Sequence, residues 1–127
     1  MTDLLRAQGL AVRLGGKSIL DGLNLDIAPG RLTCIVGPNG AGKSTLMACL
    51  AGLRKPDAGE VCLGKTPVLS MAHRARARRI GFLPQTPEIA WPLEVEALVA
   101  LGRSPHAGVG LPGEADKLIA GIERFLR

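Results

Sequence analysis

The stretch that decides the fold is Gly37-Pro-Asn-Gly-Ala-Gly-Lys-Ser-Thr45, which fits the pattern G-x-x-x-x-G-K-[ST]. Gly40 and Gly42 allow the dihedral angles and the close approach that a loop of inward-pointing backbone N–H groups requires. Lys43 supplies a compact cation, and a helix that starts there directs its positive end toward the same point. The pattern therefore predicts a loop that binds a chain of phosphates.

The residues on both sides of this loop suit that interpretation. Residues 32–36 read Leu-Thr-Cys-Ile-Val, a nearly continuous apolar run that is typical of a strand buried on both faces. After the loop, apolar residues follow at helical spacing: Leu46, Met47, Leu50 and Leu53. They predict a helix from about Lys43 to Ala51, with Gly52 as its stop. A strand before the loop and a helix after it are the setting that the motif needs.

Further from the loop, hydrophobic periodicity predicts the other elements. Apolar residues alternate over 10–14 and again over 23–27, which predicts two half-buried strands of an antiparallel ribbon. Short strands are expected at 60–63 and 79–83, helices at 71–79, 93–101 and 118–126, and a loop at 105–113.

Composition limits the class of protein. The chain has 127 residues, of which 46% are hydrophobic and 21% charged, so we expect one globular domain. Aromatic residues are only 2%, which argues against binding of single-stranded nucleic acid because bases need aromatic side chains to stack on. Although the net charge is +5, we expect no nucleic-acid partner. No apolar run approaches the roughly 18 residues that span a bilayer, and we expect no secretion signal because Asp3 and Arg6 interrupt the N-terminus.

The cysteines do not form a recognisable site. Cys34, Cys49 and Cys62 are widely spaced, and no C-x-x-C pair exists. This spacing argues against a metal knuckle or a redox motif. Because all three lie among apolar neighbours in the sequence, we expect them to be small core residues.

Three segments resemble the ATP-binding subunit of an ABC transporter: GPNGAGKSTL from Gly37, the pattern LxGLxxPxxG over 50–59, and the strand that ends as Ile-Gly-Phe-Leu-Pro-Gln85. The stretch from Val95 to His106 is similar to the subgroup that imports iron–siderophore complexes, haem and cobalamin. The resemblance implies an α/β fold, the N-terminal part of a P-loop NTPase of the ABC ATPase type. It implies that residues 1–88 form an antiparallel β-subdomain and the P-loop core, and that 89–127 begin a helical subdomain in a truncated chain.

The resemblance also implies which residues bind ATP and Mg²⁺. The phosphate-binding residues would be Gly37, Pro38, Asn39, Gly40, Ala41, Gly42, Lys43, Ser44 and Thr45. The hydroxyl of Ser44 would contact Mg²⁺, which keeps most of its shell as water and phosphate oxygens. Gln85 would touch Mg²⁺ and the catalytic water through its amide and sense the membrane subunits.

The chain departs from the family pattern in three ways. The family places an aromatic ring near position 14 to stack on adenine, and here Leu14 stands there. The signature motif LSGGQ is missing. No apolar strand ending in Asp-Glu (the Walker B motif) follows Gln85, and no switch histidine follows it either; His73 and His106 come too early and are expected at the surface. We therefore expect the 127-residue chain to bind nucleotide weakly at most, without turning it over alone.

The same departures lead to an expectation about solubility. In the family, strands from later in the sequence pair with the strand before the loop and with the strand before the glutamine. Without them, residues 32–36 and 80–83 would expose unpaired apolar edges, which favours aggregation.

The function implied by the resemblance is to couple ATP binding and hydrolysis to the import of a metal chelate: an iron–siderophore complex, haem or cobalamin. The implied partners are transmembrane permease subunits and a second ATP-binding subunit in a head-to-tail dimer, at the cytoplasmic face of the inner membrane. One alternative is a soluble ABC-type ATPase that acts on nucleic acid or ribosomes. Such a protein would be expected to have long basic insertions and a tandem second domain. The other is a P-loop small-molecule kinase, which would need a substrate-binding region and a lid with paired arginines.

A basic cluster leaves two interpretations open. It consists of Arg74, Arg76, Arg78 and Arg79. It could contact anionic headgroups or nucleic acid, or it could be the solvated face of a surface helix, as charged surfaces commonly are.

Overall fold

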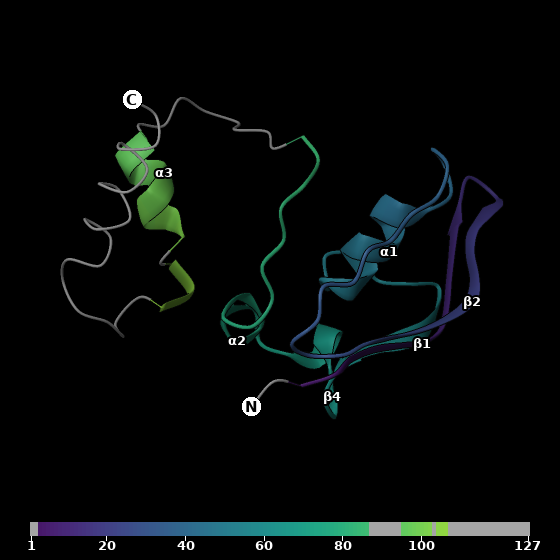
Figure 1. Cartoon of the computed structure of the whole chain (residues 1–127), viewed down its shortest axis with the longest axis horizontal. Helices are drawn as coiled ribbons and strands as arrows, with labels where there is room; N and C mark the ends of the chain where they lie inside the picture. The colour runs from purple at the N-terminus through teal and green to yellow at the C-terminus, as the bar shows by residue number, and fades with distance from the viewer. Residues whose placement is uncertain (1–2, 87–94, 103, 107–127) are drawn as a thin grey trace. The chain divides into compact units, whose positions relative to one another are not determined.

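The structure, a computed structural model, describes residues 3–86, 95–102 and 104–106 (Figure 1). The chain divides into two compact units, Met1–Ala72 and His73–Arg127, which are described separately below. The predicted division at residue 88 concerns the subdomains of the resembling family and stays a prediction.

The first unit is built on a four-stranded antiparallel sheet with the strand order β2-β1-β3-β4. Its strands are β1 (Leu5–Leu14), β2 (Lys17–Ile27), β3 (Ala58–Leu63) and β4 (Thr66–Pro67). The predicted antiparallel ribbon and the strand at 60–63 are confirmed, and the strands are longer than the alternation indicated. Gly15 and Gly16 connect β1 to β2 with φ values of 53° and 78°, the positive angles that a tight hairpin turn favours.

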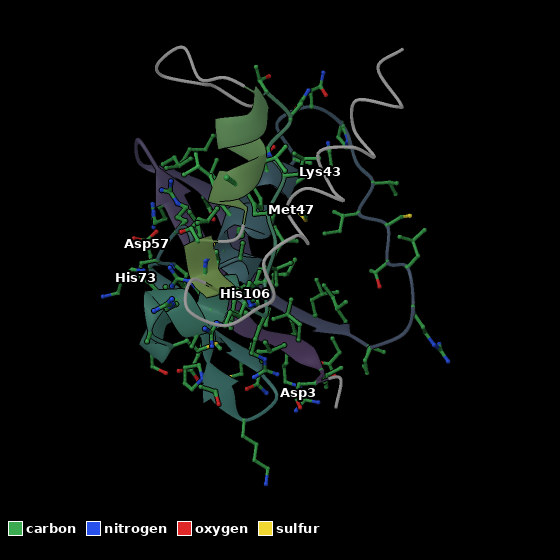
Figure 2. All side chains as sticks on the ribbon, turned by 90° about the vertical axis from the view of Figure 1, so that its left-hand side faces the viewer. Asp3, Lys43, Met47, Asp57, His73 and His106 are labelled. Atoms are coloured by element: carbon green, nitrogen blue, oxygen red, sulfur yellow. The ribbon has the colours of Figure 1, made fainter. Side chains whose placement is uncertain are left out.

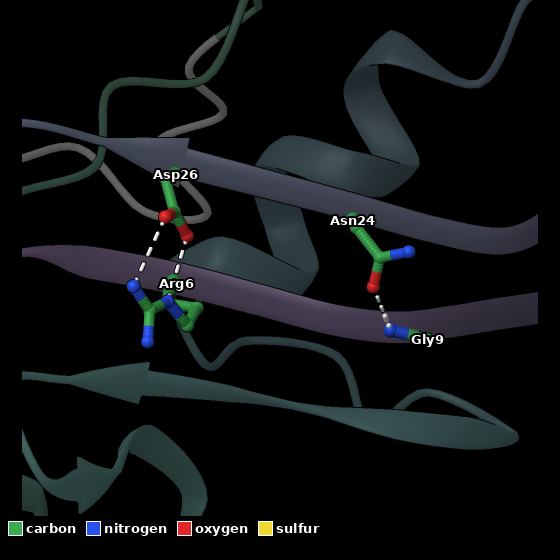
Figure 3. A network of polar contacts seen from close by, with 4 residues as sticks. All are labelled: Arg6, Gly9, Asn24 and Asp26. Atoms are coloured by element: carbon green, nitrogen blue, oxygen red, sulfur yellow. Dashed lines mark hydrogen bonds and ion pairs between the residues drawn. The ribbon is translucent and has the colours of Figure 1, made fainter.

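A bulge at Gly9 decides which side chains of β1 face the core. Gly9 has a φ of 58°, and its N–H donates a 2.8 Å hydrogen bond to the side-chain oxygen of Asn24 (Figure 3). The pairing of β1 with β2 shifts register between Ala7 and Leu10. Because the shift resets the alternation, Ala7, Leu10 and Val12 are all buried.

The core of this unit lies between the sheet and one helix. Helix α1 (Lys43–Leu50) packs on β1, and its N-terminus follows the glycine-rich loop (Figure 1). The buried hydrophobic residues are Ala7, Leu10, Val12, Leu20, Leu46, Cys49, Leu50, Ala51, Val61 and Val68. The predicted helix and its stop are confirmed, since Ala51 caps α1 and Gly52 adopts a φ of 70°.

Asp57 joins the segment after α1 to the first strand. Its N–H donates to the carbonyl of Ala11 at 2.9 Å, and its carboxylate accepts from the N–H of Arg13 at 2.7 Å. These two bonds place β3 beside β1, so the turn predicted around Pro56 has a clear role in the sheet.

Two predicted strands, the buried one at 32–36 before the loop and the short one at 79–83 before Gln85, are wrong for this structure. Residues 32–36 and 79–83 form no strand, and none of the described residues pairs with them in a ladder. A strand needs a neighbour for its N–H and C=O groups, and without one the apolar side chains stay in solvent. Leu32 is 93% exposed, and Leu83 is 86% exposed.

The core role predicted for the three cysteines holds for one of them. Cys49 is buried against the sheet, and this burial raises the pKa of its thiol. Cys62 is half-buried, whereas Cys34 is exposed because the segment 32–36 is not covered.

The second unit contains short helices: α2 (His73–Ala77), α3 (Val95–Leu101) and the 3₁₀ helix η2 (Ser104–His106). The first two confirm the helices predicted at 71–79 and 93–101. The predicted helix at 118–126 and most of the loop at 105–113 lie outside the described residues. Within 3–86, 95–102 and 104–106, no helix has the length and apolar character needed to cross a membrane.

An ion pair on the exposed face of the sheet gives a pH-dependent prediction. Arg6 donates two hydrogen bonds to the carboxylate of Asp26, at 2.8 and 3.0 Å (Figure 3). These bonds lower the pKa of Asp26 from its ordinary value of 3.8. The stabilisation is therefore complete above that value and disappears as the pH falls through the lowered pKa.

We accordingly expect wild-type protein to lose more stability between pH 5 and about pH 2 than the variant Asp26→Asn, which has no carboxylate to protonate. The difference should be small because both side chains are about half exposed. Urea midpoints across this range measure it. Parallel pH curves for the two proteins would contradict the assignment.

Candidate functional site

The start of α1 presents backbone donors that have no partner within the helix. Gly42 caps the helix in a left-handed conformation, with φ 92° and ψ 12°. The first bond of the helix runs from the N–H of Leu46 to the carbonyl of Gly42, at 2.8 Å. The N–H groups of Lys43, Ser44 and Thr45 therefore have no partner within the helix. Among the residues that the structure describes, no side chain caps this end, and its first turn holds no acidic residue, so these residues leave the positive end of the helix open to an anion.

The second strand fixes the position of this helix start. A Cβ atom built on Gly42 would lie 2.9 Å from the Cγ2 of Ile19 and 3.1 Å from its carbonyl oxygen. Only glycine fits a site this close to β2 at a positive φ. The end of the loop thus rests directly against the β1–β2 hairpin, a contact that no sequence pattern indicated.

Lys43 spans the glycine-rich loop. Its Nζ donates to the carbonyl of Gly37 at 2.6 Å and to the carbonyl of Pro38 at 2.7 Å. The N–H of Ala41 closes a turn onto the same Pro38 carbonyl at 3.2 Å. An ammonium has three donors, so two of them hold the loop and one is left for a ligand. Figure 2 shows Lys43 on α1, one turn before Met47.

The other predicted loop residues are accessible. Pro38, Asn39 and Gly40 are exposed, and Gly40 has a φ of 83°, which supports the predicted need for glycine there. Ser44 is exposed, and its hydroxyl makes no hydrogen bond within the described part of the chain; Thr45 is half-buried. Open N–H groups, a free ammonium donor and a free hydroxyl fit a magnesium nucleotide: Gly40 to Thr45 would hold phosphate, and Ser44 the metal.

The remaining predicted residues are placed as follows. Leu14 ends β1 and is 41% exposed, in the same hairpin that contacts Gly42 through Ile19. Gln85 is exposed and belongs to the second unit, and its contact with Mg²⁺ stays a prediction. His73 and His106 are both exposed, as expected (Figure 2).

A helix that begins at the lysine of a G-x-x-x-x-G-K-[ST] loop carries the phosphate-binding motif of P-loop nucleotide-binding proteins. The sequence profile of the family described as ABC transporter matches residues 20–120. Because this match covers most of the chain, the protein belongs to the ABC transporter family.

Curated relatives agree with this assignment. The chain is 42% identical over 104 residues to the hemin import ATP-binding protein HmuV of Pseudomonas aeruginosa. The aligned region covers 82% of this chain and 41% of that protein. It is 42% identical over 117 residues to the protein of the same name from Gloeobacter violaceus, covering 92% of this chain and 42% of that protein. The chain therefore spans about two-fifths of the length of these relatives.

Solved structures show the same fold. The ATP-binding subunit of an ABC transporter aligns with a TM-score of 0.70 at 24% identity, over 80% of this chain and 42% of that one. A nucleotide-free ATP-binding cassette from an ABC transporter aligns with a TM-score of 0.54 at 30% identity, over 60% of this chain and 30% of that one. The predicted fold class, an ABC-type P-loop NTPase, is confirmed.

Proposed function

We propose that this chain carries the phosphate-binding loop of an ATP-binding subunit that drives import of an iron chelate, with hemin as the first candidate. The observation that supports this most is the start of α1, where open N–H groups and the Lys43 ammonium face the same loop. The relatives named above are hemin import ATP-binding proteins, which favours hemin over an iron–siderophore complex or cobalamin.

In this proposal, each group in the loop has one task. Backbone N–H groups at the start of α1 hold phosphate oxygens, and Lys43 gives its third donor to the phosphate chain. The Ser44 hydroxyl and the Gln85 amide oxygen would be the protein ligands of Mg²⁺, which would supply charge neutralisation for the phosphates.

The proposed partners are transmembrane permease subunits and a second ATP-binding subunit, at the cytoplasmic face of the membrane. Hydrolysis needs charge stabilisation and a positioned water in addition to a phosphate cradle. Residues 1–127 contain no LSGGQ motif and no Asp-Glu strand after Gln85. We therefore propose that this polypeptide binds nucleotide without hydrolysing it; a phosphate-release rate well above that of buffer, abolished in Lys43→Ala, would contradict this.

The function is tested in the organism that encodes the chain. Disruption of the reading frame is expected to prevent growth on hemin as the sole iron source while growth on ferrous salt continues. Loss of growth on a ferric siderophore, or of cobalamin uptake, with hemin use intact would reassign the substrate. Unchanged use of all three would contradict the import function.

The base contact gives a separate prediction. Leu14 offers apolar contact but no aromatic face, and stacking of a base on a ring is worth about 1–3 kcal/mol. We expect Leu14→Trp to tighten ATP binding about 5- to 150-fold, the range that this stacking energy corresponds to, measured by calorimetric titration. Inorganic tripolyphosphate, which has no base, is the matched ligand and should bind both proteins equally. An equal gain for tripolyphosphate would mean that the tryptophan acts on the phosphates or on folding, and not on the base.

A further inference from the structure

Two arginines of α2 share one acceptor on η2. The Nε of Arg74 donates to the carbonyl of Pro105 at 3.0 Å, and the Nε of Arg78 donates to the same oxygen at 2.7 Å. Both elements belong to the second unit, where α2 packs on η2. His73 at the start of α2 and His106 at the end of η2 mark the two elements in Figure 2.

The spacing of these arginines explains why they converge. Arg74 and Arg78 are four residues apart, so they project from the same side of one helical turn. The turn itself is continuous through this point, because the N–H of Arg78 bonds to the carbonyl of Arg74 at 3.2 Å. A carbonyl oxygen has two lone pairs, and here two charged donors use them. We call this pair of hydrogen bonds, from Arg74 and Arg78 to the Pro105 carbonyl, the arginine clamp.

A helix as short as α2 depends on such a contact. Five residues are too few for a helix to be stable alone in water, since nucleation is costly and isolated helices are marginal below about 12–15 residues. Neither Arg74 nor Arg78 is buried, so packing of these side chains contributes little. The clamp is therefore a contact that stabilises α2 against η2.

The segment that carries Gln85 begins directly where α2 ends. The N–H of Ile80 bonds to the carbonyl of Arg76 at 2.9 Å, so the helical turn extends to Ile80. Gln85 follows five residues later in an irregular exposed stretch. The direction in which the chain leaves α2 therefore depends on the orientation of α2, and the clamp contributes to that orientation.

We propose that Arg74 and Arg78 are positioning residues for Gln85: by binding the Pro105 carbonyl they fix α2 on η2 and so fix the base of the segment that presents Gln85. This inference rests on the proposed role of Gln85 with Mg²⁺. Of the basic cluster, Arg74 and Arg78 each use their Nε donor within the chain.

The first experiment measures the clamp without nucleotide. Amide hydrogen exchange in the double variant Arg74→Ala/Arg78→Ala is expected to accelerate about tenfold at Arg78, Arg79 and Ile80, while the amides of α1 keep their rates. Alanine favours helix at least as well as arginine, so faster exchange reports loss of the contact with η2. Arg76→Ala is the matched control, because Arg76 contacts His73 instead of Pro105 and should change these rates less than twofold.

The second experiment separates positioning from a merely structural role. We expect the double alanine variant to bind ATP normally in EDTA but to need several-fold more Mg²⁺ for the metal-dependent part of binding, as Gln85→Ala should. The double lysine variant, which keeps two cationic donors, should recover part of the loss.

The two experiments test separately the clamp, the positioning role of the two arginines and the role of Gln85. Unchanged exchange in the double alanine variant overturns the clamp. Faster exchange with a normal Mg²⁺ requirement, while Gln85→Ala raises that requirement, overturns the positioning role. A normal Mg²⁺ requirement in Gln85→Ala overturns the proposed role of Gln85 and the positioning inference with it, while the exchange data still stand for the clamp.

Discussion

Gly59→Ala is expected to destabilise the first unit by at least about 3 kcal/mol. Gly59 has a φ of +82°, which costs a residue with a side chain about 1–2 kcal/mol. In addition, the new Cβ would collide with the backbone of β1, at the carbonyls of Gln8 and Gly9. That backbone cannot move away, because Gln8 pairs with Glu60 in the sheet and Gly9 forms the bulge held by Asn24. Urea unfolding followed by circular dichroism measures the loss.

Gly30→Ala is the matched control for this change. Gly30 also has a positive φ, +69°, but a Cβ there would meet nothing within 4 Å. It should therefore lose only the conformational part, about 1–2 kcal/mol. Equal losses in both variants would show that β1 and β3 do not approach each other as closely as the structure places them.

Lys43→Ala is expected to weaken ATP binding by about 10- to 100-fold. A hydrogen bond to a charged group is worth about 1.5–3 kcal/mol, and the ammonium also ties the loop to the carbonyls of Gly37 and Pro38. Both effects disappear together, so the loop loses a ligand contact and its own internal support. Titration of the wild type and the variant with ATP by calorimetry gives the two dissociation constants.

Lys55→Ala controls for the loss of one positive charge. Lys55 is exposed in the turn after α1, and removing it changes the net charge by the same amount. Its affinity for ATP should stay within about twofold of the wild type at physiological salt, where exposed charges are screened beyond roughly 8 Å. Comparable weakening in both variants would mean that general charge, and not the Lys43 contact, attracts the nucleotide.

The elements that were predicted correctly from the sequence are those determined by residues close together in the chain. The ribbon follows from alternation and from the Gly15–Gly16 turn, and α1 follows from apolar spacing between a glycine start and the Gly52 stop. The segments 32–36 and 79–83 differ, because an apolar run becomes a strand only when another strand pairs with it. The bulge at Gly9 was missed for a related reason, since its partner Asn24 lies on another strand.

In the candidate site, too, the residues of the local motif were predicted from the sequence, and the contacts between distant residues were not. The motif identified Lys43, Ser44 and the two loop glycines, because the requirements of a phosphate chain are local in sequence. The motif did not reveal that Gly42 rests on Ile19, or that Arg74 and Arg78 meet at Pro105. Those contacts join residues separated by more than twenty positions and depend on how the elements pack.

The most direct test of the central claim is a residue-resolved titration of backbone amide resonances with ATP. If the start of α1 binds triphosphate, the amides of Gly40, Gly42, Lys43, Ser44 and Thr45 will shift progressively and reach saturation together, and those of Gly30 and Gly64 will not move. If those five resonances stay in place at millimolar nucleotide, the glycine-rich loop does not bind phosphate in this protein.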